Sequence, residues 1–181
     1  MNYLELYDKY YPHGTQARDI LYRHSRSVAD FALEINAEKH LGLEIGEIET
    51  AAMLHDIGIY LTDAPGIDCH GSEPYIRHGI LGGALLRLEG FPEYAARVAE
   101  RHTGAGISPE DIDEMNLPLP KDAVLMPQTL LERLVCYADK FYSKSGDMQK
   151  KSLERVRNSM ARHSAATLER FEALHKEFKS L

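Results

Sequence analysis

The 181 residues of this chain include 44% hydrophobic and 27% charged side chains, and the formal net charge is −7. This length suits one domain with a buried core, and the acidic balance gives no long-range attraction to nucleic acid or to anionic membranes. No apolar run approaches the ~20 residues that span a bilayer, and the polar N-terminus is unlike a signal peptide. We therefore expect a cytoplasmic protein without membrane or specific nucleic-acid binding, and with two reduced cysteines, Cys69 and Cys136.

Apolar residues recur at helical spacing in the first third of the chain. Three helices are predicted there, over residues 2–11, 15–40 and 46–57. Gly58 is expected to stop the third of these helices at its C-terminal end. Residues 59–76 contain two prolines and two glycines, so they are predicted to form a loop.

The remainder of the chain continues this alternation of helices and loops. Further helices are predicted over residues 78–89, 92–102, 129–143 and 147–179. Residues 103–128 contain four prolines and are predicted to form a second long loop, with a short helix over residues 109–115. No segment alternates with the period of two that marks a strand, so no sheet is expected. The prediction is a single all-α domain over residues 1–181, built as a bundle of six or seven helices.

Five of the predicted helices each carry one titratable residue on the apolar face. His24, for example, follows Leu21 by three positions and precedes Val28 by four. The same reasoning applies to the full set, His24, His55, His78, His102 and Asp139. Asp56 adds a carboxylate beside His55 at a predicted helix end, where it is placed to bridge two ions. A buried polar or charged group without a partner costs several kcal/mol.

A bound cation removes this cost, because it takes neutral imidazole nitrogens and ionised carboxylate oxygens as ligands. Any one inward-facing histidine is more often an ordinary hydrogen-bonded core residue. That interpretation is kept for the other histidines, His13, His40, His70, His163 and His175. The joint occurrence of the six residues predicts a metal centre formed by His24, His55, Asp56, His78, His102 and Asp139.

The order of these residues, with the string HDIG at 55–58, resembles the HD superfamily of metal-dependent phosphohydrolases over about residues 16–145. The strings HGILGG at 78–83 and ERHTGAG at 100–106 resemble a subgroup with two further histidines and a binuclear centre. Segments from residue 100 to 140 are similar to small HDIG-type proteins, largely of unassigned function. The same histidine pattern occurs in symmetrical dinucleoside-tetraphosphate hydrolases of the superfamily.

The resemblance implies a division of the ligands between two ions. One ion would be held by His24, His55, Asp56 and Asp139. Asp56 would bridge to a second ion, held also by His78 and His102. Mixed nitrogen and oxygen ligands suit iron, manganese, cobalt, nickel or zinc. Ile59 departs from the pattern, since many HDIG relatives carry lysine there, and no phosphate contact is expected from it.

The activity implied is hydrolysis of a phosphoester or phosphoanhydride, in a nucleotide or another small phosphate. A metal-activated hydroxide would attack phosphorus, with Asp56 as the catalytic residue between the ions. Cationic side chains beside the ligands are candidates to bind the phosphate, and we name Arg77, Arg101 and Lys140. The alternative for these three is an ordinary solvated surface charge.

Two other functions fit the same ligands. A di-iron oxygenase similar to myo-inositol oxygenase would use the same ligand order to activate oxygen. A regulatory module would keep the metal for structure alone, although two long loops disfavour it because structural metal sites are usually closed. The apolar stripe of residues 147–179 predicts packing on the bundle, or alternatively pairing with a second copy in a homodimer.

Overall fold

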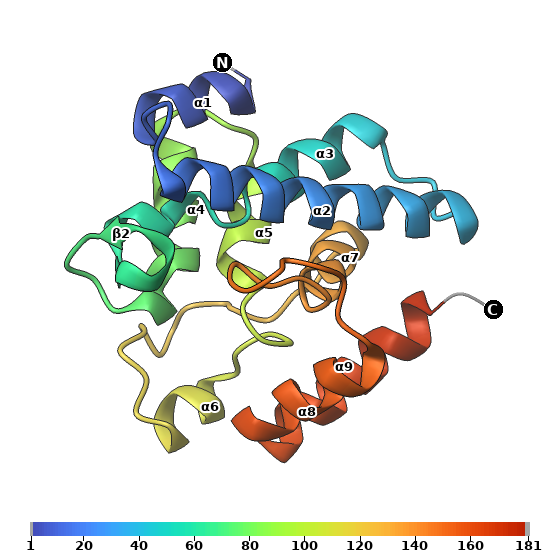
Figure 1. The fold of residues 1–181 in the computed structure, drawn as a ribbon. Helices are drawn as coiled ribbons and strands as arrows, with labels where there is room; N and C mark the ends of the chain where they lie inside the picture. Colours follow the sequence, from blue (N-terminus) through green and yellow to red (C-terminus); the bar gives the residue numbers. More distant parts are fainter. Residues whose placement is uncertain (1, 180–181) are drawn as a thin grey trace.

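Nine α-helices and one two-stranded sheet form the part of the chain described by the computed structural model, residues 2–179 (Figure 1). The first half contains α1 to α5, over Tyr3–Tyr10, Gln16–Glu38, Ile45–Leu54, His78–Leu88 and Glu93–Arg101. The second half contains α6 to α9, over Pro109–Glu114, Leu130–Asp139, Leu153–His163 and Ala165–Phe178. None of the helices in this described range is long and apolar enough to cross a bilayer.

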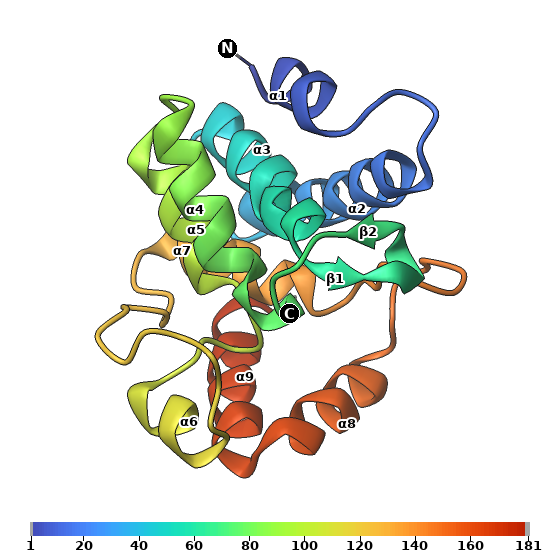
Figure 2. The same cartoon turned by 90° about the vertical axis from the view of Figure 1, so that its left-hand side faces the viewer.

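The predicted all-α class is confirmed, and the long helix α2 runs across the front of the bundle in Figure 1. It packs against α3 and α7, while α4 and α5 lie side by side next to α3 (Figure 2). The apolar face of α2 is fully buried at Leu21 and Val28, the residues that flank His24 along the stripe. Burial of each such side chain contributes about 1.5–3 kcal/mol. The hydrophobic face that stabilises the bundle is therefore also the face that carries His24 inward.

Helix α3 does not end in the way that the sequence predicted. The helix ends at Leu54, and a 3-10 helix, η1 (Ile57–Leu61), continues the chain without a left-handed glycine stop. Gly58 instead marks the crossing of η1 and α4. A Cβ atom on Gly58 would come closer than 3.0 Å to the carbonyl oxygen of His78 and to the backbone nitrogen of Gly82. Gly58 therefore sets the distance between His55–Asp56 and the start of α4.

The first long loop contains a small sheet that the sequence analysis did not predict. Strand β1 (Asp63–Ala64) pairs antiparallel with β2 (Cys69–His70). Two-residue strands are too short to display a period-two pattern, which explains the missed prediction. Two further 3-10 turns, η2 (Pro65–Ile67) and η3 (Tyr75–Arg77), complete this segment and lead directly into α4.

The expectation of one helix over residues 147–179 is wrong, and so is the count of six or seven helices. The backbone of Ser164 is extended, and its hydroxyl accepts a hydrogen bond from the backbone N–H of Thr167 at 2.9 Å. Ser164 thereby ends α8 and caps α9, and the two helices pack against each other as a pair (Figure 2). Helix α9 also packs on α7. The apolar stripe that could have met a second copy is buried within the chain, at Val156, Met160, Phe171, Leu174 and Phe178.

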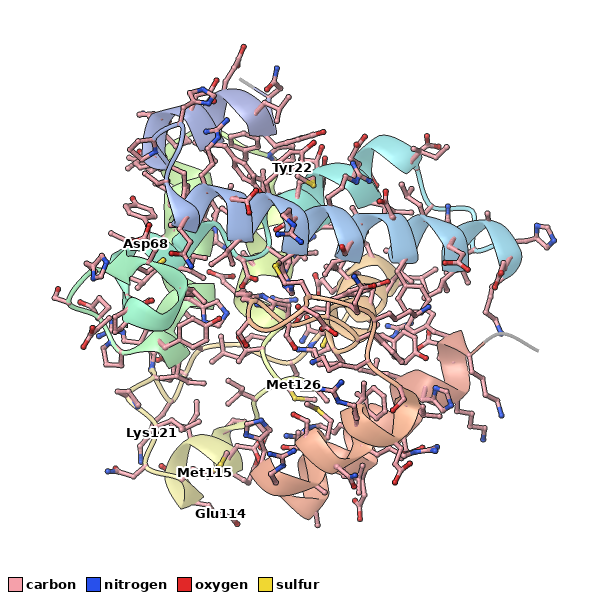
Figure 3. The ribbon with its side chains drawn as sticks, in the orientation of Figure 1. Tyr22, Asp68, Glu114, Met115, Lys121 and Met126 are labelled. Atoms are coloured by element: carbon pink, nitrogen blue, oxygen red, sulfur yellow. The ribbon has the colours of Figure 1, made fainter. Side chains whose placement is uncertain are left out.

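The second long loop carries its own small core beside α6. Buried Ile107, Ile112, Leu119 and Leu125 form this core, and Ile76 and Ile80 pack against it. A partly buried ion pair between Arg170 of α9 and Asp111 of α6, at 2.6 Å, connects the loop to the C-terminal helices. Met115 and Lys121 lie in this segment at the lower edge of the molecule (Figure 3).

Candidate metal centre

The six residues singled out in the sequence converge from five parts of the fold. His24 comes from α2, His55 and Asp56 from the end of α3, His78 from the start of α4, His102 from the end of α5, and Asp139 from the end of α7. All six are buried. Their side chains form two groups whose ligand atoms lie within 4.8 Å of one another, and both groups contain Asp56.

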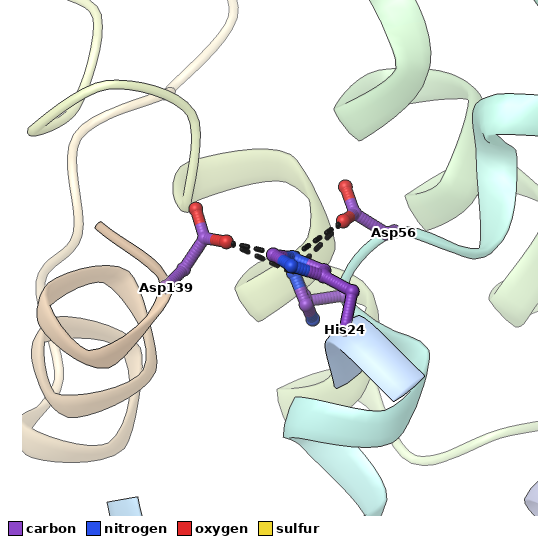
Figure 4. Close-up of side chains that lie close together, drawn as sticks. His24, Asp56 and Asp139 are labelled. Carbon is purple, nitrogen blue, oxygen red and sulfur yellow. Dashed lines mark hydrogen bonds and ion pairs between the residues drawn. The ribbon is translucent and has the colours of Figure 1, made fainter. Parts of the chain in front are cut away.

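The first group consists of His24, His55, Asp56 and Asp139. The Nε2 atom of His24 lies 2.9 Å from Oδ1 of Asp139 and 3.2 Å from Oδ2 of Asp56. The Nε2 atom of His55 lies 3.0 Å from the same Asp56 oxygen. Figure 4 shows His24 between the two carboxylates, which approach it from opposite sides. This arrangement offers two imidazole nitrogens and two carboxylate oxygens to one ion.

The second group consists of Asp56, His78 and His102. The Nε2 atoms of His78 and His102 lie 3.0 Å apart, and each lies 3.3 Å from Oδ1 of Asp56. The two oxygens of Asp56 are therefore divided between the groups, Oδ2 toward the first and Oδ1 toward the second. A carboxylate in this position has the geometry to bridge two cations.

The backbone fixes which nitrogen of His78 and His102 carries the proton. The Nδ1 atom of His78 lies 2.7 Å from the carbonyl oxygen of Tyr75, and that of His102 lies 2.7 Å from the carbonyl oxygen of Ala99. A carbonyl oxygen can only accept, so each Nδ1 must donate, and each neutral ring directs a lone pair from Nε2 into the site. Two such lone pairs 3.0 Å apart repel each other unless a cation lies between them.

Buried carboxylate oxygens without hydrogen bonds also indicate that a cation fits here. Both carboxylate oxygens of Asp56 are buried without a hydrogen bond of acceptable geometry to any described residue, although the ammonium of Lys144 lies near Oδ2. Buried polar atoms are rarely left in that condition, because each loses its hydration without compensation. The Nε2 atoms of the surrounding histidines lie within ion-pair distance of the Asp56 oxygens, as ligands of a common metal ion would. The donor set therefore fits divalent cations.

The protonation states agree with this interpretation for most of the ligands. Burial lowers the pKa of His78 to about 3 and also lowers the pKa of His102, so both rings are neutral at pH 7. Burial opposes ionisation of Asp56 and Asp139, yet His55 and Lys144 beside Asp56, and Lys140 beside Asp139, hold the pKa of each well below its usual range. Burial alone would lower the pKa of His55, but Asp56 and Asp139 raise it to about 9, so a cation there would displace a proton.

Two lysines lie against the carboxylate ligands. The Nζ atom of Lys140 lies 2.7 Å from Oδ2 of Asp139 and donates to the carbonyl oxygen of His102 at 2.8 Å. The Nζ atom of Lys144 lies 2.5 Å from Oδ2 of Asp56, and its side chain is 15% exposed. Lys140 was a candidate from the sequence, whereas Lys144 was missed. Lys144 follows the end of α7, where no helical period shows which way a side chain points.

The two arginine candidates, Arg77 and Arg101, do not line the cavity that is described below. Arg101 pairs with Glu132 at 2.9 Å and donates to the carbonyl oxygen of Val124. Arg77 pairs with Glu73 at 3.0 Å. A phosphate contact by either arginine stays a prediction, and each now has a carboxylate partner elsewhere. Ile59 is fully buried in the hydrophobic core, away from any position that could contact a phosphate.

A cavity of about 310 Å³ opens beside the metal ligands His78, His102 and Asp139. One side is apolar and belongs to the segment before α4 and to the second long loop, with Ile76, Ile107, Met115 and Leu117. An adjoining hollow of about 310 Å³ shares several lining residues and adds Tyr142, Ser143, Lys151 and Met160. Both are lined by Tyr75, Lys140, Lys144 and His163. The ring of Tyr75 stacks on that of His78 at 4.6 Å and forms part of the rim.

Comparison with known proteins places these residues in a family context. An uncharacterised protein of Methanocaldococcus jannaschii is 40% identical over 119 residues, which cover 64% of this chain and 62% of that protein. Proteins named tRNA (cytidine(56)-2'-O)-methyltransferase from Thermoplasma volcanium and Picrophilus torridus are 32% and 31% identical over 169 residues. These matches cover 93% and 91% of this chain, but the chain spans only 44% and 43% of those two proteins. No solved structure is significantly similar to the chain.

The family model described as HD domain matches residues 21–144, which is more than half of the chain. All six residues of the two metal-ligand groups fall within this range. The helical bundle and the buried histidine–aspartate groups agree with the match. The chain therefore belongs to the HD domain family.

Proposed function

We propose that this chain is a metal-dependent phosphohydrolase that cleaves a phosphoester or phosphoanhydride bond in a nucleotide or another small phosphate. The observation that carries the proposal is the position of Asp56. One carboxylate oxygen belongs to each ligand group, and both groups border a cavity large enough for a small substrate. Because the cavity reaches His78, His102 and Asp139, the site is open on one side, as catalytic metal sites are.

Each ligand has a distinct task in this proposal. His24, His55 and Asp139 would hold one ion, His78 and His102 the other, and Asp56 both. Two divalent ions bound at these ligands supply a nucleophilic water at neutral pH and neutralise charge on phosphoryl oxygens. The nitrogen and oxygen donors suit manganese, iron, cobalt, nickel or zinc. Asp56 is the residue whose loss would remove both ions, so we assign it the catalytic role.

The cavity wall supplies the remaining requirements for a phosphorylated substrate. Lys140 and Lys144 bring two ammonium groups beside the carboxylate ligands, where they can donate to phosphoryl oxygens and stabilise their charge. The apolar side, with Ile107 and Leu117, can accept the organic part of the substrate and exclude water. This combination of cations and apolar surface favours a phosphorylated organic molecule over the neutral polyol expected for an oxygenase.

Methyl transfer, named for two relatives, is not proposed for this chain. The matched region is less than half of each of those proteins. The site described here offers ligands for cations next to lysines, which suits hydrolysis of a phosphate. A regulatory module with a purely structural metal is disfavoured by the cavity that reaches the ligands.

A phosphatase and nucleotide-hydrolysis panel with Mn²⁺ or Fe²⁺ tests the proposal. Wild-type protein is expected to release phosphate or nucleotide product. The His55→Ala/Asp56→Ala variant is expected to lose at least about 100-fold in rate, because the ions that would activate water lose their ligands. The control is Asp8→Ala/His13→Ala, which removes an exposed histidine–aspartate pair of the same chemistry. Equal rates for wild type and the His55→Ala/Asp56→Ala variant would contradict the assignment. Substrate-dependent oxygen uptake without hydrolysis would support the oxygenase instead.

A further inference from the structure

We propose that Lys151 and His163 form a binding site for a second phosphate, so that the preferred substrate carries at least two phosphate groups. The proposal rests on the phosphohydrolase function above and makes it more specific. Lys151 lies in the segment between α7 and α8, and His163 is the last residue of α8. Both lie beyond residues 21–144, so they belong to the part of the chain that the family match does not include.

Both side chains line the hollow that adjoins the cavity, together with the metal ligand Asp139. The adjoining hollow is lined by Asp139, Lys140 and Lys144 together with Lys151 and His163. The apolar lining residues belong to the first cavity and come from the segment before α4 and from the second long loop. A substrate with its scissile phosphoryl group at Asp139 and its organic part on the apolar side would extend its remaining phosphate toward α8.

The three lysines that line the hollow differ in whether a carboxylate neutralises their charge. Lys140 pairs with Asp139, and Lys144 pairs with Asp56. Lys151 forms no ion pair with a carboxylate anywhere in residues 2–179, and the hollow that it lines is also lined by Lys140, Lys144 and Asp139, which is already paired with Lys140. Burial lowers the pKa of Lys151; Asp139 opposes this shift, and Lys140 and Lys144 add to it. An ammonium group that lies beside other cations at the wall of a hollow, and that has no ion-pair partner of its own, is suited to bind an anionic ligand.

His163 is the second proposed phosphate ligand and lines both the cavity and the hollow. Its side chain is exposed at the end of α8 and forms no hydrogen bond or ion pair within the described chain. The backbone of Lys151 is anchored by a hydrogen bond from its N–H to the carbonyl oxygen of Phe141 at 2.7 Å. The two donors therefore line the hollow from separate segments, and the backbone of Lys151 is held in place. A phosphate bound by them would be a second one, beside the phosphate that Lys144 contacts.

The test compares ADP with AMP as probes on the metal-loaded full chain. The measured quantity is the ratio of kcat/KM for ADP to kcat/KM for AMP. Lys151→Met and His163→Gln are each expected to lower this ratio about tenfold, the effect of losing one charge-assisted hydrogen bond. Lys150→Met is the matched control, because the ammonium of Lys150 lies over the ring of Phe31 at 3.4 Å and does not line the cavity. A purely structural role of Lys151 would lower both kcat/KM values together and leave the ratio unchanged.

A second measurement separates this inference from the hydrolase proposal. If no phosphate compound is cleaved, the dissociation constants of ADP and AMP are compared by calorimetry with the same variants. Tighter binding of ADP by about tenfold, lost in Lys151→Met and kept in Lys150→Met, would support the second-phosphate site alone. Equal affinities for the two nucleotides, no binding of either, or an unchanged ratio in Lys151→Met would overturn it.

Discussion

The Nζ atom of Lys144 lies 2.5 Å from Oδ2 of Asp56, the one residue that both ligand groups share. Burial disfavours the ammonium form, but Asp56 and other neighbours raise the pKa of Lys144, so the group is charged at neutral pH. A positive charge at this distance repels a cation bound to the same carboxylate. The same charge can stabilise a phosphoryl group that approaches the site.

Substitution of Lys144 should therefore move metal affinity and turnover in opposite directions. Lys144→Met is expected to bind Mn²⁺ at least severalfold more tightly, because a competing charge is gone, and to lose at least tenfold in kcat, because a phosphoryl contact is gone. Calorimetric Mn²⁺ titration and steady-state kinetics measure the two effects. Weaker Mn²⁺ binding in Lys144→Met would contradict the competition, and Lys150→Met should change neither quantity.

Gly58 is predicted to be intolerant of a side chain. Gly58→Ala should destabilise the fold by about 1–3 kcal/mol, the usual range for overpacking, because its Cβ would meet backbone atoms of His78 and Gly82. Displacement of His78 should also weaken metal binding. The control is Gly46→Ala in α3, where nothing lies within 4 Å of an added Cβ and alanine is the better helix former. Denaturant unfolding measures both variants, and equal stability of Gly58→Ala and Gly46→Ala would contradict the close packing.

Glu132 should make the fold sensitive to acid. Burial opposes its ionisation, but backbone N–H groups of Gln128 and Thr129 and the Arg101 guanidinium lower the pKa of this carboxylate below 4.5. Because the folded-state pKa is the lower one, the stabilisation is present above pH 4.5 and is lost as the pH falls through the folded-state value. Glu132→Gln should cost about 1–3 kcal/mol at pH 7, and the difference from wild type should shrink below pH 4. A difference that stays constant between pH 7 and pH 3 would contradict this account.

Ser164 separates two helices that the apolar stripe alone would have joined. Ser164→Ala should cost about 1 kcal/mol, because the cap on Thr167 N–H is lost. Ser164→Gly should cost only a few tenths of a kcal/mol. Thermal unfolding at pH 7 measures the two variants, and an alanine variant as stable as wild type would argue against the cap.

The candidate ligands could be predicted because each lies within or at the end of a helix whose apolar residues mark the inward face. His24 between Leu21 and Val28 is an example, and its inward position is confirmed. The periodic pattern does not extend past a helix end. Lys144 and Lys151 lie in the segment after α7, so no spacing indicated that they line the cavity.

Side-chain pairing over long distances also escaped prediction. Arg101 adjoins the ligand His102 in sequence, yet its guanidinium pairs with Glu132, which is 31 positions away in the chain. The break at Ser164 was hidden for a related reason, since the apolar stripe continues through it from Met160 to Thr167. At Ser164 a local hydrogen bond begins a new helix although the apolar pattern continues. Only the three-dimensional fold shows which partner each side chain contacts.

Metal content after Mn²⁺ loading and desalting tests the central role of Asp56 most directly. We expect two ions per chain in the wild type, one in His102→Gln, which leaves the first group intact, and none in Asp56→Asn, which replaces one carboxylate oxygen by an amide nitrogen and removes the negative charge that both groups share. Mass spectrometry of the native proteins, with circular dichroism to confirm folding, gives the count. A folded Asp56→Asn variant that keeps as many ions as the wild type, or a wild type that binds none, would contradict the shared-carboxylate centre.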